Sequence, residues 1–62
     1  MPIIHVTLVE GRDNEKVEKF IKKVAEVAHE ELDAPYPSIR VFVDEIPANR
    51  FAVGQTLKSE KL

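Results

Sequence analysis

The shortness of the chain is the feature that most limits what it can fold into. It has 62 residues and no cysteine, and a chain of this size buries only about 60% of the surface that its unfolded form exposes. Small domains therefore rely on disulfides, a structural metal or a partner subunit. Disulfides are excluded here, and two histidines, His5 and His29, are too few for a structural zinc site. We expect one domain, residues 1–62, that forms an oligomer and holds no metal.

Charge and hydropathy argue against several classes of protein. Nine basic and 11 acidic residues give a net charge of −2, whereas nucleic-acid binders normally show a basic excess or a basic stripe. No apolar run approaches the roughly 18 residues that a membrane span needs. The first residues, 1–5, lack the charged leader and the cleavage site of a secretory signal. We expect a cytoplasmic protein that binds neither nucleic acid nor membrane.

Hydrophobic periodicity predicts a strand, a helix and a second strand. Residues 3–9 are rich in β-branched side chains and carry apolar residues on both faces, which predicts a strand that is covered on both sides, as in a sheet closed over by another subunit. Asp13 is a suitable N-cap for a helix that runs from residue 14, and prolines at 35 and 37 prevent its continuation. Residues 38–45 alternate again and predict the second strand. The expected apolar stripe of the helix comprises Val17, Phe20, Ile21, Val24, Val27, Ala28 and Leu32.

The order of these elements predicts the topology. A strand–helix–strand run with short joints is a βαβ unit, whose strands are parallel and whose crossover is right-handed. After Pro47, residues 50–57 with Gly54 in their midst predict a short hairpin, and we expect the polar tail behind it to dock on a neighbouring subunit. The expected fold class is therefore α+β: a two-layer βαβ unit with parallel strands and a short C-terminal hairpin.

Several short features together carry a resemblance to a known family. Pro2 follows Met1 and leads an apolar strand, and Arg12 ends a Glu-Gly-Arg turn before the long helix. The segment Leu-Asp-Ala-Pro at 32–35 leads into Ser-Ile-Arg-Val at 38–41, and an aromatic residue, Phe51, precedes a glycine-containing segment. Over essentially its whole length the chain resembles 4-oxalocrotonate tautomerase and its short relatives.

The resemblance implies an activity and an assembly. Members of this family are isomerases that move a proton along enol or dienol acids such as 2-hydroxymuconate, without a cofactor. They form hexamers, trimers of dimers, and they lose Met1, which exposes the amine of proline. Carried over by position, Pro2 is the general base, Arg12 and Arg40 bind the carboxylate and polarise the carbonyl, and Phe51 lines the pocket. The arginines of one site come from adjacent subunits, so an isolated chain is expected to be inactive.

The chemistry of these groups agrees with those roles. A general base works best when its pKa lies near ambient pH, and an apolar pocket and neighbouring cations both disfavour a protonated amine. Arg12 and Arg40 are permanent cations that can hold a carboxylate through a bidentate fork and stabilise developing enolate charge. The mechanism requires the loss of Met1, because with Met1 attached the nitrogen of Pro2 is a tertiary amide. Ser38 is a further candidate to contact substrate through its hydroxyl.

Each of these residues also has a purely structural interpretation. Pro2 can stand at the start of a strand, where a missing N–H costs nothing. Arg12 can belong to the turn, and Arg40 can be an exposed strand residue. His5 is expected to be a strand residue with a satisfied hydrogen bond. His29 falls late in the helix, where positive charge is favoured, and is expected at the surface.

The chain departs from the family near its C-terminal end, and this keeps other functions open. Some members carry a late arginine that contacts substrate, whereas here only Lys58 and Lys61 could take its place. Relatives with the same proline hydrate or dehalogenate unsaturated acids with the help of an extra acid, for which Glu10, Asp44 and Glu45 are available. A third interpretation, from another class, is a non-catalytic oligomeric binding protein.

Overall fold

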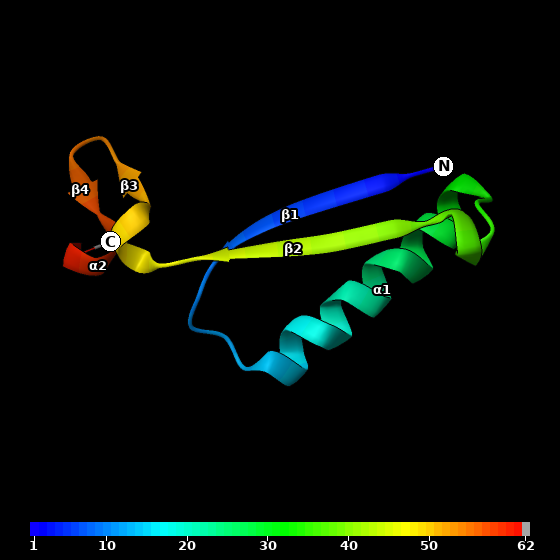
Figure 1. The fold of residues 1–62 in the computed structure, drawn as a ribbon, viewed down its shortest axis with the longest axis horizontal. Coiled ribbons are helices and arrows are strands. Elements are labelled where there is room, and N and C mark those ends of the chain that lie inside the picture. Colours follow the sequence, from blue (N-terminus) through cyan, green and yellow to red (C-terminus); the bar gives the residue numbers. More distant parts are fainter. Residues whose placement is uncertain (62) are drawn as a thin grey trace.

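The computed structural model describes residues 1–61 and shows a βαβ unit followed by a small C-terminal hairpin (Figure 1). The α+β class and the order of elements expected from the sequence are confirmed. The elements are β1 (Ile3–Val9), α1 (Asn14–Leu32), η1 (Tyr36–Ser38), β2 (Arg40–Ile46), η2 (Ala48–Arg50), β3 (Ala52–Val53), β4 (Thr56–Leu57) and α2 (Lys58–Lys61), where η marks a 3-10 helix.

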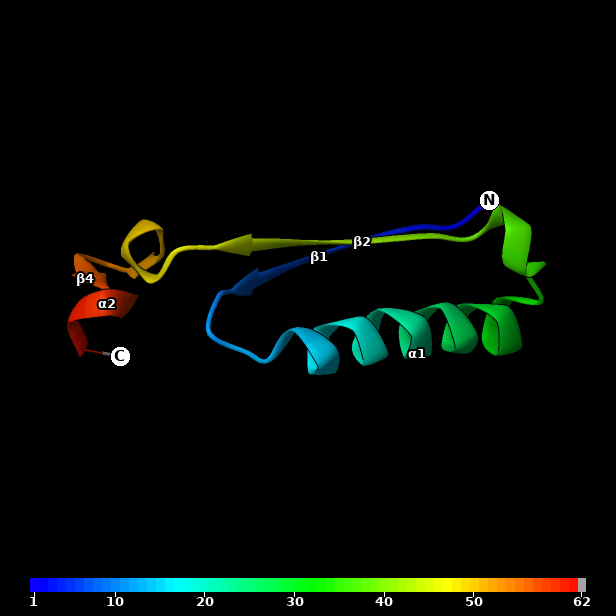
Figure 2. The ribbon, with the colours of Figure 1, turned by 60° about the horizontal axis from the view of Figure 1, so that its bottom comes forward.

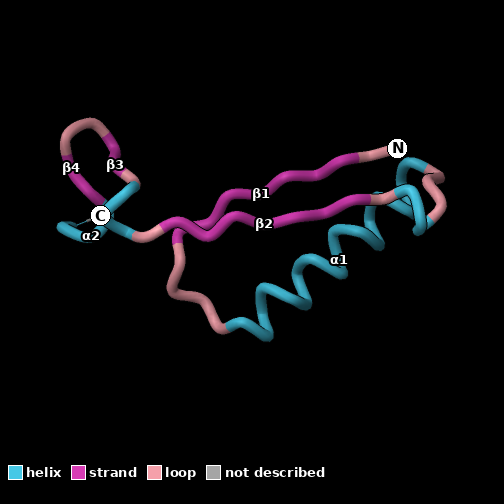
Figure 3. The backbone as a smooth tube through the Cα atoms, viewed as in Figure 1, coloured by secondary structure: helices cyan, strands magenta, loops and turns pink. Residues whose placement is uncertain are grey.

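The two long strands are parallel and pair in register along their whole length (Figure 3). Ile3 lies opposite Arg40 at one end of the ladder, and Val9 lies opposite Ile46 at the other. Backbone hydrogen bonds extend the pairing, since the amide of Arg40 donates to the carbonyl of Pro2 over 3.0 Å. The sheet therefore fixes the place of Pro2 relative to the start of β2.

Helix α1 covers one face of this sheet and leaves the other face bare (Figure 2). The buried side chains among the described residues lie in or near that contact, and the outer face of β1 and β2 is exposed. Ile3 and Phe42 on the outer face are 65% and 46% exposed. The covering of both faces predicted from β1 is thus absent within one chain. The buried side chains are Val17, Ala28, Ala34 and Ile39.

The apolar surface of α1 is wider than its contact with the sheet. Val17 and Ala28 are buried, but Phe20 and Val27 are 40% and 49% exposed, and Leu32 is 64% exposed. The apolar stripe lies on the predicted helix, but these three positions are outside the core of one chain. The physical reason is the width of the sheet: two strands about 5 Å apart cover only part of the circumference of a helix.

The two ends of α1 use backbone geometry rather than side-chain caps. Asp13 occupies the N-cap position with φ −61° and ψ 134°, as predicted, but its side chain makes no capping hydrogen bond. Asp33 ends the helix in the left-handed region with φ 54°. This conformation turns the chain away from the helix axis before the first of the two prolines, Pro35, is reached.

Strand β2 begins two residues later than predicted and ends one residue later. Ser38, expected at the start of the strand, belongs instead to η1, where its amide donates to the carbonyl of Pro35 over 2.9 Å. Pro37 lacks an N–H and has a fixed φ, which suits the tight 3-10 turn. The sheet therefore starts at Arg40, immediately after this turn.

The C-terminal segment projects beyond the end of the sheet (Figures 1 and 2). The predicted hairpin is confirmed as antiparallel β3 and β4, and its turn contains Gly54 with φ 61°. The tail behind the hairpin forms α2, and its docking on a neighbouring subunit stays a prediction. The first amide of α2, from Lys58, donates to the carbonyl of Phe51 over 2.8 Å. Glu60 Oε1 accepts a hydrogen bond from the amide of Leu57 over 2.8 Å and so caps α2.

The described part of the chain is extended and has a small core. Its principal dimensions are 42 × 24 × 14 Å. No described side chain between residues 47 and 60 is buried. A search of the described helices finds none long and apolar enough to cross a membrane.

Candidate active site

The candidate residues fall into two groups at opposite ends of β1. Pro2, Ser38 and Arg40 lie where the sheet begins, whereas Arg12 and Phe51 lie where β1 ends. The strand has seven residues, and a strand rises about 3.3 Å per residue, so the groups are roughly 20 Å apart. One chain therefore does not bring all five residues into one site.

The first group is held by hydrogen bonds to η1. Arg40 Nη1 donates to the carbonyl of Pro37 over 2.7 Å and to that of Ile39 over 3.2 Å. Ser38 Oγ donates to the carbonyl of Pro35 over 2.8 Å. The guanidinium is thus positioned through one nitrogen, while the fork has N–H groups on two further nitrogens that can reach an anion. Arg40 itself is exposed.

The backbone of Pro2 lies beside the backbone of Arg40 on the neighbouring strand. Pro2 is half-buried, and its carbonyl accepts the amide of Arg40. Met1 in front of it is 78% exposed. The core of the chain therefore does not depend on the Met1 side chain.

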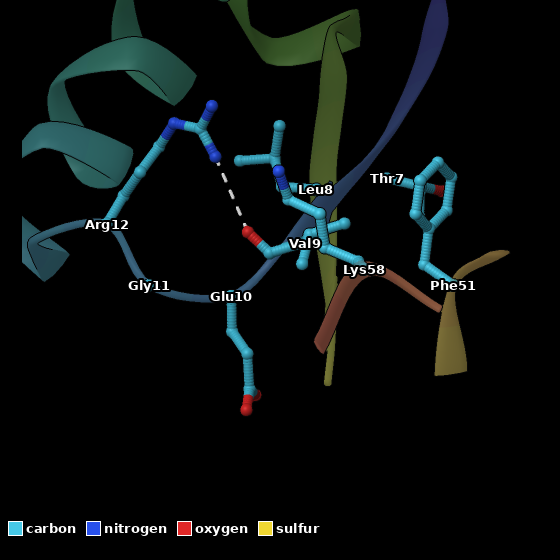
Figure 4. Close-up of a pocket in the computed structure, with 8 residues that line it drawn as sticks. All are labelled: Thr7, Leu8, Val9, Glu10, Gly11, Arg12, Phe51 and Lys58. Atoms are coloured by element: carbon cyan, nitrogen blue, oxygen red, sulfur yellow. Dashed lines mark hydrogen bonds between the residues drawn. The ribbon is translucent and has the colours of Figure 1, made fainter. Parts of the chain in front are cut away.

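The second group lines a hollow between the end of β1, the turn that follows it and the C-terminal hairpin (Figure 4). Its volume is about 580 Å³, within the range of small-molecule sites. In this view Phe51 lies at one side of the hollow, and Arg12 lies at the other (Figure 4). The lining residues are Thr7, Leu8, Val9, Glu10, Gly11, Arg12, Phe51 and Lys58.

The turn after β1 directs Arg12 back toward the strand. Gly11 has φ 133°, a conformation that side chains disfavour, and an added Cβ would meet nothing within 4 Å. Glycine is needed there for its backbone freedom and not for space. Arg12 Nη1 then donates to the carbonyl of Val9 over 3.4 Å, a long contact that leaves the guanidinium adaptable (Figure 4).

The three acids considered for water activation differ in position. Glu10 lines the hollow, but its carboxylate points away from Arg12 and Phe51 (Figure 4). Asp44 lies on the open face of the sheet, where its Oδ2 is 2.6 Å from Nε2 of His5. The ring of His5 also stacks on Phe42 with centroids 4.5 Å apart, so the hydrogen-bonded strand histidine predicted from the sequence is confirmed. Glu45 is exposed and does not line the hollow.

His29 and Lys58 have surroundings that their sequence positions did not reveal. His29 was expected at the surface, but it is half-buried, its Nδ1 lies 2.7 Å from the carbonyl oxygen of Ala34, and its ring stacks on Tyr36 with centroids 4.0 Å apart. Lys58 is a second cation that lines the same hollow as Arg12. Only the hairpin brings it there, so the sequence signal was limited to a late basic residue.

A small α+β chain with this βαβ order, a proline at its second residue and arginines after β1 and at the start of β2 has the features of the tautomerase-like class. The comparisons with known proteins specify the family. Residues 2–61 match the family described as "Tautomerase enzyme", and the chain belongs to this family of isomerases, as the resemblance to 4-oxalocrotonate tautomerase indicated.

Individual relatives agree with this assignment. A 2-hydroxymuconate tautomerase of Pseudomonas fluorescens is 41% identical over 54 residues, which cover 87% of this chain and 86% of the relative. A probable tautomerase of Lactiplantibacillus plantarum is 36% identical over 61 residues, covering 98% and 95%. Among solved structures, the 4-oxalocrotonate tautomerase homologue TomN of the tomaymycin biosynthetic pathway superposes with a TM-score of 0.88 at 38% identity, covering 94% of this chain and 89% of TomN.

Proposed function

We propose that this enzyme converts the enol or dienol form of unsaturated 2-hydroxy acids, such as 2-hydroxymuconate, to the keto form. The observation that carries the proposal is the placement of Pro2 beside Arg40 at the open start of the sheet, with the guanidinium already held by η1. The similarity to 2-hydroxymuconate tautomerases supports the choice of substrate.

The proposed roles follow from the chemistry of each group. The free amine of Pro2 accepts the hydroxyl proton of the dienol and delivers a proton to carbon. Arg40 binds the carboxylate and the adjacent oxygen, and stabilises the negative charge that develops on that oxygen. Arg12 provides a second cation, and Phe51 provides an apolar wall. Ser38 is a candidate to contact the substrate through its hydroxyl, close to Arg40.

The amine becomes available only when Met1 is removed. With Met1 attached, the Pro2 nitrogen is an amide and cannot act as a base. Because Met1 is 78% exposed, its removal disturbs no buried contact of the described chain. We therefore propose that the active form begins at Pro2.

The active site is proposed to form between copies of the chain. The two groups of candidate residues are separated by the length of β1, so the proline of one copy must meet Arg12 and Phe51 of another. The bare sheet face with Ile3 and Phe42, together with the small core, supports association, since a chain this short gains much of its stability from partners. A hexamer built as a trimer of dimers is the expected assembly.

Ketonisation of 2-hydroxymuconate followed by ultraviolet absorbance tests this function. The sample is oligomeric protein whose mass shows that Met1 is absent, and Pro2→Ala is the variant. Loss of a positioned general base lowers the rate by about 100-fold or more. Equal turnover by both proteins would contradict the role of Pro2, and no turnover by the processed parent protein would contradict the tautomerase proposal.

The same protein samples distinguish the tautomerase from the two alternative functions, a hydratase or dehalogenase and a non-catalytic binding protein. A hydratase or dehalogenase would consume an unsaturated or halogenated acid with addition of water or release of halide, and Glu10 is the acid that lines the hollow. A non-catalytic binding protein would retain Met1 in its native form and turn over none of these acids.

A further inference from the structure

We propose that His29 is a positioning residue, which acts through the turn η1 on the two side chains assigned to the reacting end of the substrate, Ser38 and Arg40. This inference rests on the proposed function and deepens it, because it names a residue that sets the geometry of that site without contacting substrate. Neither the family assignment nor the similarity to individual relatives gives His29 a role.

His29 fixes the backbone at the point where the chain leaves α1. Its Nδ1 lies 2.7 Å from the carbonyl oxygen of Ala34. Because a carbonyl oxygen can only accept, Nδ1 carries the proton and donates it to this bond. Ala34 is buried, and a polar group in such a place is costly to leave without a partner. The residue just before Pro35 is therefore held by the histidine.

The ring of His29 makes a second contact, inside the turn itself. It stacks on the ring of Tyr36, with centroids 4.0 Å apart and an angle of 18° between the planes. Tyr36 is the first residue of η1 and is 52% exposed, so the imidazole is a major support for its ring. His29 thus holds this segment at two points, at the backbone before the turn and at the side chain that begins it.

The segment held in this way supplies the acceptors for both side chains. The carbonyl of Pro35 accepts the amide of Ser38 over 2.9 Å and its Oγ over 2.8 Å. The carbonyl of Pro37 accepts Nη1 of Arg40 over 2.7 Å. In Figures 1 and 2 the turn lies beside the N-terminal end of the chain, where Pro2 stands. A shift of η1 therefore moves both side chains relative to the proline.

The contact between helix and sheet is made by other residues. The buried cluster there consists of aliphatic side chains with further aliphatic side chains packed against it, and His29 lies beside this cluster rather than within it. Loss of the imidazole should therefore loosen the turn more than the fold. The cluster comprises Ala28, Ala34 and Ile39, with Ile4, Ala25 and Val41 packed against them.

Two substitutions separate the two contacts of His29. His29→Phe keeps an aromatic ring and removes the donor, whereas His29→Asn keeps an amide nitrogen near the place of Nδ1 and removes the ring. We expect His29→Phe to lower kcat/KM for 2-hydroxymuconate about tenfold, mainly through kcat, because a displaced guanidinium stabilises developing charge less well. His29→Asn should recover part of this loss. Glu30→Gln, an exposed substitution in the same helical turn, is the control and should leave both constants unchanged.

A double-mutant cycle distinguishes positioning from general support of the structure. In an Arg40→Ala background the guanidinium is absent, so His29→Phe should change kcat/KM less than about twofold. A purely structural histidine would give the same factor with and without the arginine. Equal factors in the two backgrounds, in proteins of parental oligomeric state, would overturn the inference.

Hydrogen exchange keeps this inference separate from the proposed function, because it needs no turnover. The amides of Ser38 and Ile39 donate within the turn over 2.9 and 3.0 Å, and the amide of Arg50 makes a matching 2.9 Å bond in η2. We expect about tenfold faster exchange at the first two amides in His29→Phe and no change at Arg50. Unchanged exchange at Ser38 and Ile39 would overturn the inference. Faster exchange there in a protein whose parent turns over no dienol would contradict only the tautomerase proposal.

Discussion

At the scale of single residues, Arg40 is an exposed side chain whose contacts restrict its position. Its Nη1 is bonded to the carbonyls of Pro37 and Ile39, and its amide is bonded to the carbonyl of Pro2. An exposed arginine that is held at one nitrogen loses less conformational freedom when it binds an anion than a free one does. This preorganisation is the physical reason to assign it the reacting end of the substrate.

Replacing Arg40 should therefore affect catalysis and leave folding intact. We expect Arg40→Ala to lower kcat/KM for 2-hydroxymuconate by about 100-fold, because a cation that stabilises developing charge is lost. Arg40→Lys should recover only part of this loss, since an ammonium cannot form the planar fork. Steady-state kinetics on protein of unchanged oligomeric state provides the measurement, and full activity in Arg40→Ala would refute the assignment.

The sequence was sufficient to select most candidate side chains but not their grouping. Pro2, Arg12 and Arg40 follow from residue type and from their places next to predicted elements. Their division between two ends of one sheet depends on the length of β1 and on parallel pairing. Lys58 gains its place only because β3 and β4 fold back on Phe51, a contact that short-range patterns do not encode.

At the scale of elements, the segment between α1 and β2 acts as the support of the Arg40 end. His29 Nδ1 lies 2.7 Å from the carbonyl oxygen of Ala34, and its ring stacks on Tyr36 with centroids 4.0 Å apart. Tyr36 begins η1, and the carbonyl of Pro37 in the same turn holds the Arg40 guanidinium. The last turn of the helix is thus joined to Arg40, the proposed substrate-binding arginine, through one short turn.

Removing the aromatic stack should loosen this support. We expect Tyr36→Ala to destabilise the protein by about 1 kcal/mol, which corresponds to a fall in Tm of about 4–8 °C for a domain of this size. It should also lower kcat/KM, because the acceptor of the guanidinium becomes less ordered. Tyr36→Phe keeps the ring and is the matched control.

Thermal melts at equal protein concentration measure this effect, since the stability of an oligomer depends on concentration. An unchanged Tm and unchanged kinetics in Tyr36→Ala would show that the stack does not support the turn.

The sequence predicted the elements better than their contacts. The bounds of β1 and α1 agree with the structure because apolar periodicity and the stop before the prolines are local signals. The start of β2 was placed too early, since the 3-10 turn around Pro37 interrupts an otherwise alternating pattern. The apolar stripe of the helix includes Phe20 and Val27, which the sheet of one chain does not cover, because the sequence pattern does not distinguish the surface buried within a chain from the surface available to a partner.

At the scale of the whole molecule, the proposed function divides the candidate residues of the chain between two half-sites. One end presents Pro2 and Arg40, and the other presents Arg12, Phe51 and Lys58, at the two ends of a sheet whose outer face is bare. The C-terminal hairpin extends the molecule beyond the sheet to 42 Å in length and buries no described side chain. A neighbouring copy could complete the site and cover the exposed apolar face at the same time.

The measurement that tests this account most directly is complementation between two impaired variants, Pro2→Ala and Arg12→Ala. Each variant alone should have little activity, and the two are unfolded together, refolded as mixed oligomers and assayed with 2-hydroxymuconate. If proline and arginine come from different copies, random mixing rebuilds an intact pair in roughly a quarter of the sites. The account predicts recovery of about that share of parental turnover; activity no greater than the average of the two variants, in oligomers shown to be mixed, would contradict it.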